Sequence, residues 1–140
     1  MTLTHPEMLE GNRALIEMAD RLYAENLPTY YARQRSALEQ VPWTLWDTVF
    51  VNAYVAKRFP TAVHRDGNLK GMRTVITPLG KFSGGELVLL RWRVAIPYRP
   101  GDLVIFNAED LHGNLKIEGP RLSVALYCPR WIAASTLHAA

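Results

Sequence analysis

From Thr48 to Tyr127 the chain consists of short apolar runs separated by turn residues, and this alternation limits the possible fold more than any other feature. The runs are rich in β-branched and aromatic residues, which favour strands. Clusters of glycine, proline and serine separate them, and no helical pattern lies between. Such a series predicts an antiparallel sandwich or barrel. The expected strands are residues 48–55, 63–66, 73–77, 86–90, 94–98, 102–106 and 121–127.

The region before these strands has a different periodicity. Apolar residues spaced by three and four predict an amphipathic helix from about Asn12 to Asn26, and Pro28 suits the first turn of a second helix that runs to about Gln40. The side chains expected to face inward on the second helix are Tyr30, Tyr31, Ala37 and Leu38. The expected fold class is therefore α+β, with N-terminal helices packed on a β-barrel.

The length of 140 residues suits a single domain with a proper core. We expect residues 1–42 to form a helical support, 43–131 the barrel core and 132–140 a C-terminal tail. No apolar run approaches the roughly 18 residues that span a bilayer, and no secretory signal is visible. Cys128 is the one cysteine, so an intramolecular disulfide is excluded. A cytoplasmic or nuclear protein is expected, a monomer by default.

The basic residues are concentrated in the middle of the chain. The net charge is +3, but residues 57–99 carry nine basic and two acidic side chains, net +7. A basic field around a binding site favours an anionic partner, either nucleic acid or a small acid. A solvated face of strands is the alternative explanation of the same pattern.

Two histidines and an aspartate form a candidate metal site. His64-Arg65-Asp66 closes a strand-like run, and His112 follows a later apolar run. Two imidazoles and one carboxylate are the facial triad that holds iron(II) and leaves three coordination positions open. Each residue alone could be an ordinary turn or core side chain, so the prediction depends on their joint occurrence.

Further polar residues follow the strand period of two. Arg121 and Ser123 would project from one face of the last strand, where a guanidinium can grip a carboxylate with two hydrogen bonds. Asn52 and Tyr54 show the same spacing on the first strand. These four side chains are expected to line one pocket.

The order of these motifs resembles the iron(II)- and 2-oxoglutarate-dependent dioxygenases, which fold as a double-stranded β-helix, or jelly roll. The resemblance runs from about Thr48 to Trp131. Within that superfamily, His64-Arg65-Asp66-Gly67-Asn68 and the block from Gly84 to Asp102 are most similar to the TET/JBP branch, including its small microbial and fungal members.

The resemblance implies roles for the candidate residues. His64, Asp66 and His112 would hold Fe(II), while Arg121 and Ser123, with Asn52 and Tyr54, would hold 2-oxoglutarate. With dioxygen, the site would hydroxylate a C–H bond, for which the methyl group of 5-methylcytosine in DNA is the first expectation. The target base would have to leave the duplex stack. The expected substrate contacts are Arg65, Asn68 and Arg73, and the expected phosphate contacts are Lys57, Arg58, Lys70, Arg73, Lys81, Arg91 and Arg93.

Two other functions remain open at this point. The same oxidation could act on an amino acid, a peptide or a small molecule, because a fold does not fix a substrate. A barrel that binds a metal without catalysis is the third possibility, but it leaves Arg121 and Ser123 unexplained.

Overall fold

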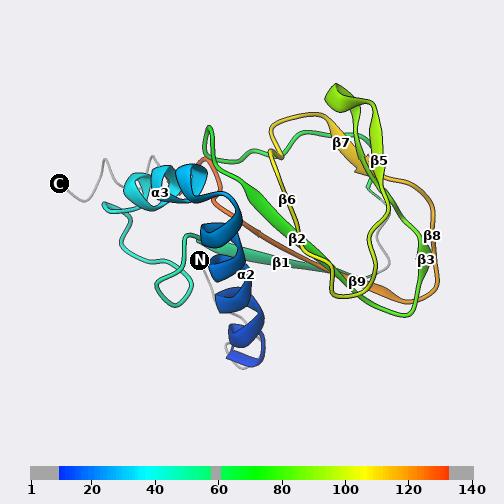
Figure 1. The fold of residues 1–140 in the computed structure, drawn as a ribbon, viewed down its shortest axis with the longest axis horizontal. Coiled ribbons are helices and arrows are strands. Elements are labelled where there is room, and N and C mark those ends of the chain that lie inside the picture. The colour runs from blue at the N-terminus through cyan, green and yellow to red at the C-terminus, as the bar shows by residue number, and fades with distance from the viewer. Residues whose placement is uncertain (1–9, 58–60, 133–140) are drawn as a thin grey trace.

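The computed structural model describes residues 10–57 and 61–132 (Figure 1). Two helices, α2 (Arg13–Asn26) and α3 (Pro28–Ala37), lie together at one side of the β-structure. They agree with the helices predicted from the sequence, although α3 ends earlier than expected. No helix in the described ranges is both long and apolar enough to cross a membrane.

The strands form two principal antiparallel sheets. The larger has the order β1-β9-β2-β6, and the smaller has the order β5-β4-β7. A two-stranded ribbon joins β3 to β8 at one end. The strands are β1 (Asn52–Lys57), β2 (Thr74–Gly80), β3 (Ser83–Gly84), β4 (Leu87–Leu89), β5 (Val94–Ile96), β6 (Val104–Phe106), β7 (His112–Asn114), β8 (Ile117–Glu118) and β9 (Arg121–Tyr127). A 3-10 turn, η1 (Leu90–Trp92), connects β4 to β5.

The larger sheet separates two cores. On β9, the side chains of Val124 and Leu126 belong to the cluster that includes Ile16 and Tyr23 of α2, so this face of the sheet packs on the helices. The second cluster contains Leu87 and Leu89 of β4 together with Phe106 of β6, so it fills the space between the two sheets. Because side chains alternate along a strand, the residues between those on the helix side face the barrel interior. The alternation therefore brings the polar residues Arg121 and Ser123 into the barrel.

Three local expectations were wrong in detail. The first strand begins at Asn52 instead of Thr48, because the Thr48 hydroxyl bonds to the Leu45 carbonyl and receives the Phe50 N–H in a local turn. On α3, Tyr30 and Ala37 are exposed, whereas Gln34 is buried. Gln34 can be buried because it bonds to the Tyr23 hydroxyl, the Val49 carbonyl and the Arg73 N–H.

The third difference concerns residues 63–66, which form no regular strand and make a single β-bridge from His64 to His112. The predicted division into helical support, barrel core and tail stays a prediction. Residues 1–9 of the support and 133–140 of the tail lie outside the described ranges.

Candidate metal centre and its pocket

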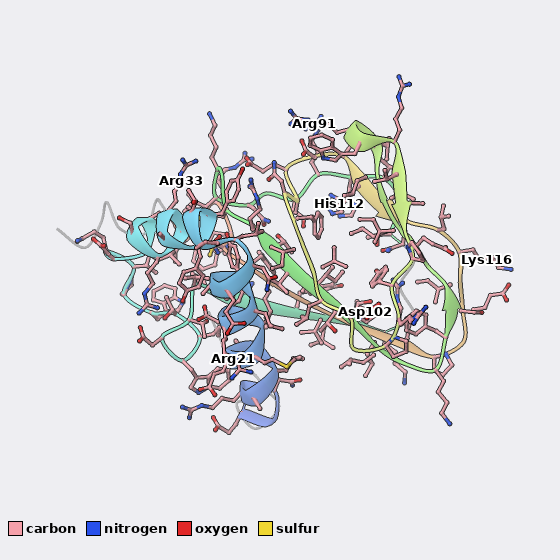
Figure 2. The ribbon with its side chains drawn as sticks, viewed as in Figure 1. Arg21, Arg33, Arg91, Asp102, His112 and Lys116 are labelled. Atoms are coloured by element: carbon pink, nitrogen blue, oxygen red, sulfur yellow. The ribbon has the colours of Figure 1, made fainter. Side chains whose placement is uncertain are left out.

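The three predicted metal ligands meet at one end of the barrel. His112 lies on β7, and the bridge between His64 and His112 places the His64–Asp66 segment beside that strand. Their candidate ligand atoms all lie within 4.8 Å of one another. Asp66 Oδ1 is 3.1 Å from His64 Nε2, and Asp66 Oδ2 is 3.8 Å from His112 Nε2. Figure 2 shows His112 between the two sheets.

Main-chain carbonyls orient both imidazoles. His64 Nδ1 lies 2.8 Å from the Ala62 carbonyl oxygen, and His112 Nδ1 lies 2.9 Å from that of Asp110. A carbonyl can only accept, so each Nδ1 donates to the main chain, and Nε2 is the ring atom that each histidine turns toward Asp66 and a metal. Burial also lowers the pKa of His112 below its usual 6.5, which favours the neutral form that metals bind.

A pocket of about 140 Å³ extends from these ligands into the space between the sheets. One water needs roughly 10–15 Å³ of cavity volume of this kind, so the pocket holds several waters' worth of space and can accept a small organic acid. Both sheets contribute to its wall. Its lining comprises Tyr54, Ala56, Thr61, His64, Asp66, Thr74, Ile76, Leu87, Phe106, His112, Asn114, Arg121, Ser123 and Ala125.

Arg121 is a buried cation in this pocket. Its side chain is 2% exposed, its Nη1 donates to the Gly85 carbonyl at 2.9 Å, and its guanidinium lies near the rings of Phe82 and Tyr98. No carboxylate among the described residues pairs with it. A buried charge without a counter-charge is costly. The site is therefore suited to an anionic group entering from the pocket.

Gly85 makes room for this arginine. It has φ +75°, in the left-handed region that glycine adopts without strain. A Cβ at this position would lie 2.4 Å from Arg121 Nη1 and 2.8 Å from Ile117 Cγ1. Two local features therefore require glycine at position 85: the left-handed backbone conformation and the close approach of the Arg121 guanidinium.

Asn114 is a pocket residue that the sequence reasoning missed. Its Nδ2 donates to the Gly85 carbonyl and to the Tyr98 hydroxyl, while its Oδ1 accepts from Thr61. A signal for it existed: Asn114 stands two residues after His112, so on a strand both side chains point to the same face. Thr61 and Tyr98 had no comparable signal, because their contacts join segments far apart in the chain.

The predicted co-substrate residues are only partly brought together. Ser123 and Tyr54 line the pocket with Arg121, and Tyr54 is 55% exposed at its edge. Asn52 does not line it, because its Nδ2 donates to the Tyr127 hydroxyl instead. The period of two on β1 puts Asn52 and Tyr54 on one face, but only Tyr54 lies far enough along the strand to line the pocket.

The three predicted substrate residues occupy different environments. Arg65 is exposed beside the metal ligands and donates to the Glu109 carbonyl. Asn68 is 1% exposed and donates to the Thr74 hydroxyl, which is the environment of a structural side chain. Arg73 is half-buried and stacks on Tyr30, at 4.1 Å from guanidinium carbon to ring centroid. It lines a separate cavity.

The residues present fit an iron(II) ion with 2-oxoglutarate. Two imidazole nitrogens and one carboxylate supply the donor set of a facial triad. Arg121 supplies the unpaired buried cation that a second carboxylate needs, in the same pocket. The fit thus rests on the donor set and on the buried charge, which are independent observations.

Comparisons with known proteins identify the family. The Tet_JBP family model, described as the oxygenase domain of the 2OGFeDO superfamily, matches residues 2–130. The chain is 35% identical over 119 residues to "Bifunctional helicase and thymine dioxygenase JBP2" of Trypanosoma brucei brucei (strain 927/4 GUTat10.1), covering 81% of this chain and 11% of that protein. It is 28% identical over 119 residues to "Thymine dioxygenase JBP1" of Crithidia fasciculata, covering 84% of this chain and 14% of that one.

A solved structure also resembles this fold. "NgTET1 in complex with 5mC DNA" superposes with a TM-score of 0.63 and 15% identity, covering 85% of this chain and 48% of that chain. This likeness confirms the predicted α+β fold with a double-stranded β-helix. The chain spans only about a tenth of the length of the JBP2 relative and about a seventh of that of the JBP1 relative.

Proposed function

The chain belongs to the Tet_JBP family of oxygenase domains in the 2OGFeDO superfamily, and we propose that it is an Fe(II)- and 2-oxoglutarate-dependent dioxygenase that oxidises the methyl group of a pyrimidine in DNA. The observation that carries the proposal is the placement of Arg121 in the pocket that opens from His64, Asp66 and His112. A metal-binding barrel without catalysis would give no reason to bury an unpaired guanidinium there.

The chain's own residues prepare the site for reaction. His64, Asp66 and His112 would hold the iron, with both Nδ1–H groups tied to the main chain. Arg121 would pair with the distal carboxylate of 2-oxoglutarate, and the Ser123 hydroxyl can donate to the same group. When bound, iron and 2-oxoglutarate supply the activation of dioxygen that hydroxylates a C–H bond.

Apolar side chains control the surroundings of these polar groups. Leu87 and Phe106 are buried in the pocket wall, where they limit the access of water. The ring of Phe106 also packs against His112, edge to face, at 5.0 Å between centroids. A drier site strengthens the interaction between Arg121 and a bound carboxylate.

The proposed substrate class is a 5-methylpyrimidine in DNA. The sequence relatives are named thymine dioxygenases, and the structural neighbour is a complex with 5mC DNA, so the two point to methyl groups at the same ring position. The net charge of +7 over residues 57–99 agrees with a polyanionic substrate. The proposed target is therefore the methyl group of either 5-methylcytosine or thymine. A DNA substrate agrees with the expected cytoplasmic or nuclear location.

Nucleoside mass spectrometry tests the proposal. The protein is loaded anaerobically with Fe(II) and 2-oxoglutarate, and air is then admitted with methylated or unmethylated DNA of one sequence. We expect 5-hydroxymethylcytosine or 5-hydroxymethyluracil to form, accompanied by the formation of succinate. Succinate formation that DNA never stimulates would point to an amino-acid, peptide or small-molecule substrate. Absence of succinate would contradict the oxygenase itself.

The Arg121→Ala variant tests the binding of 2-oxoglutarate separately from the binding of iron. We expect this variant to need about 10-fold or more additional 2-oxoglutarate for half-maximal succinate formation, since it loses a charge-assisted pair, while iron binding is retained. His112→Ala is the matched variant that should lose iron-dependent turnover. Ordinary 2-oxoglutarate dependence in Arg121→Ala would contradict the assigned role.

A further inference from the structure

A second cavity lies next to the metal site and carries two cation–aromatic pairs. Arg73 stacks on Tyr30 with its guanidinium carbon 4.1 Å from the ring centroid, and Arg91 lies over Trp92 at 5.4 Å. All four side chains line this cavity. Tyr30 comes from α3 and Trp92 from η1, so distant parts of the chain supply the two pairs.

We propose that this cavity, lined by Tyr30, Arg73, Arg91 and Trp92, binds a single-stranded segment of nucleic acid. The inference rests on the proposed DNA substrate and names the surface that would hold it. Aromatic faces that stack bases, beside cations that contact phosphates, are the usual means by which proteins bind single strands. A base inside a duplex is already stacked on its neighbours, so the aromatic faces suit an unpaired strand.

Exposure and charge support this assignment. Trp92 is 63% exposed and Tyr30 is 40% exposed, so each residue keeps solvent-accessible surface beside the arginine that lies over its ring. Arg73 has no carboxylate partner among the described residues, because its side chain donates to the Gly71 carbonyl. Asp110 also lines the cavity and pairs with Arg91 at 3.3 Å, but the Arg91 side chain is 63% exposed and this pair is weakly held. The cavity keeps a net positive lining.

The turn that carries Trp92 is fixed by the backbone. Arg93, which follows η1, has φ 52° in the left-handed region, although it is not a glycine. Such a conformation costs of the order of 1 kcal/mol and persists only where the surrounding structure holds it. β4 and β5 pair on either side of this turn, so Arg91 and Trp92 project together from the end of a paired hairpin.

The cavity adjoins the metal pocket at one shared wall residue. Phe106 lines both this cavity and the metal pocket. The Asp110 main-chain carbonyl receives the Nδ1–H of His112, while its side chain faces Arg91. Figure 2 shows Arg91 at the same end of the barrel as His112. A strand bound here would therefore lie beside the residues that would hold the iron.

Fluorescence anisotropy with a labelled single-stranded oligonucleotide tests the inference on the full chain. Trp92→Ala should weaken binding about 10-fold through lost stacking. Arg73→Gln and Arg91→Gln should each weaken binding, and each should lower the slope of log affinity against log salt by about 0.7. Arg21→Gln on α2 removes the same charge elsewhere, and Trp131→Ala removes another exposed tryptophan, so these are the matched controls.

The outcomes separate this inference from the proposed function. Loss of single-strand affinity in Trp92→Ala and both arginine variants, with the controls unchanged, supports the cavity. If the wild type oxidises DNA and the three variants bind like the wild type, the cavity is overturned while the function stands. If only a duplex binds and Trp92→Ala has no effect, the cavity is likewise overturned. If the wild type binds no oligonucleotide and DNA is never oxidised, the cavity and the DNA substrate both fail, and succinate formation reports separately on the oxygenase.

Discussion

Asn114 and Arg121 donate hydrogen bonds to the same acceptor, the main-chain carbonyl of Gly85, at 3.2 and 2.9 Å. This shared acceptor couples the strand that carries His112 to the strand that carries the carboxylate-binding cation. The metal site and the co-substrate site are thereby fixed relative to one another through one peptide group.

Asn114→Ala tests this coupling. The variant removes donors to Gly85 and Tyr98 and the acceptor of Thr61, so we expect a loss of about 1–3 kcal/mol in the free energy of unfolding. We also expect a rise of about 5-fold or more in the 2-oxoglutarate needed for half-maximal turnover. Asn52→Ala is the comparison, since Asn52 bonds to Tyr127 outside the pocket. A larger 2-oxoglutarate effect in Asn52→Ala would restore the sequence prediction.

Gly85→Ala should displace Arg121. Its new Cβ would meet the guanidinium at 2.4 Å, while Gly101→Ala adds a Cβ with nothing within 4 Å. Both glycines have positive φ, +75° and +88°, so both substitutions carry a similar backbone cost of about 1–2 kcal/mol. We expect both variants to lose thermal stability, but only Gly85→Ala to require more 2-oxoglutarate, by about 10-fold. An equal 2-oxoglutarate requirement in the two variants would show that the contact between the new Cβ and Arg121 does not affect co-substrate binding.

The metal site should be formed before the metal binds. The His64–His112 bridge has main-chain hydrogen bonds of 2.9 and 3.0 Å, so the backbone already brings the rings to 4.3 Å between centroids. We expect the chelated protein to keep its far-UV circular dichroism, and Mn(II) to raise the melting temperature of the wild type by mass action. Asp66→Asn should abolish that rise. Unfolding on chelation would refute a preformed site.

Much of this site could be predicted because its chemistry depends on local sequence. His64 and Asp66 stand two residues apart, and Arg121 and Ser123 follow a strand period that fixes their common face. Asn52 fits the same period, yet its side chain finds a nearer partner in Tyr127, and a sequence pattern does not show such competition. Asn68 likewise turns inward to Thr74. The buried Gln34 was missed because its partners, Tyr23, Val49 and Arg73, are set by tertiary packing.

Cys128 gives a test of the helix-side core, independent of the active site. Its side chain is fully buried, its Sγ donates to the Val49 carbonyl, and burial raises the pKa of the thiol from 9.0 to about 12. At pH 8 the thiolate fraction is therefore roughly 1000-fold lower than in an unfolded chain, and iodoacetamide should label Cys128 only in denaturant. The unfolded thiol loses its proton first, so the free energy of unfolding should fall as pH rises above about 9. Denaturant titrations at pH 7 and pH 10 should show a larger fall in the wild type than in Cys128→Ala, in which the tyrosine contributions are unchanged. An equal fall in both proteins, or rapid native labelling, would mean that the thiol reaches solvent and that the core between α2 and the larger sheet opens readily.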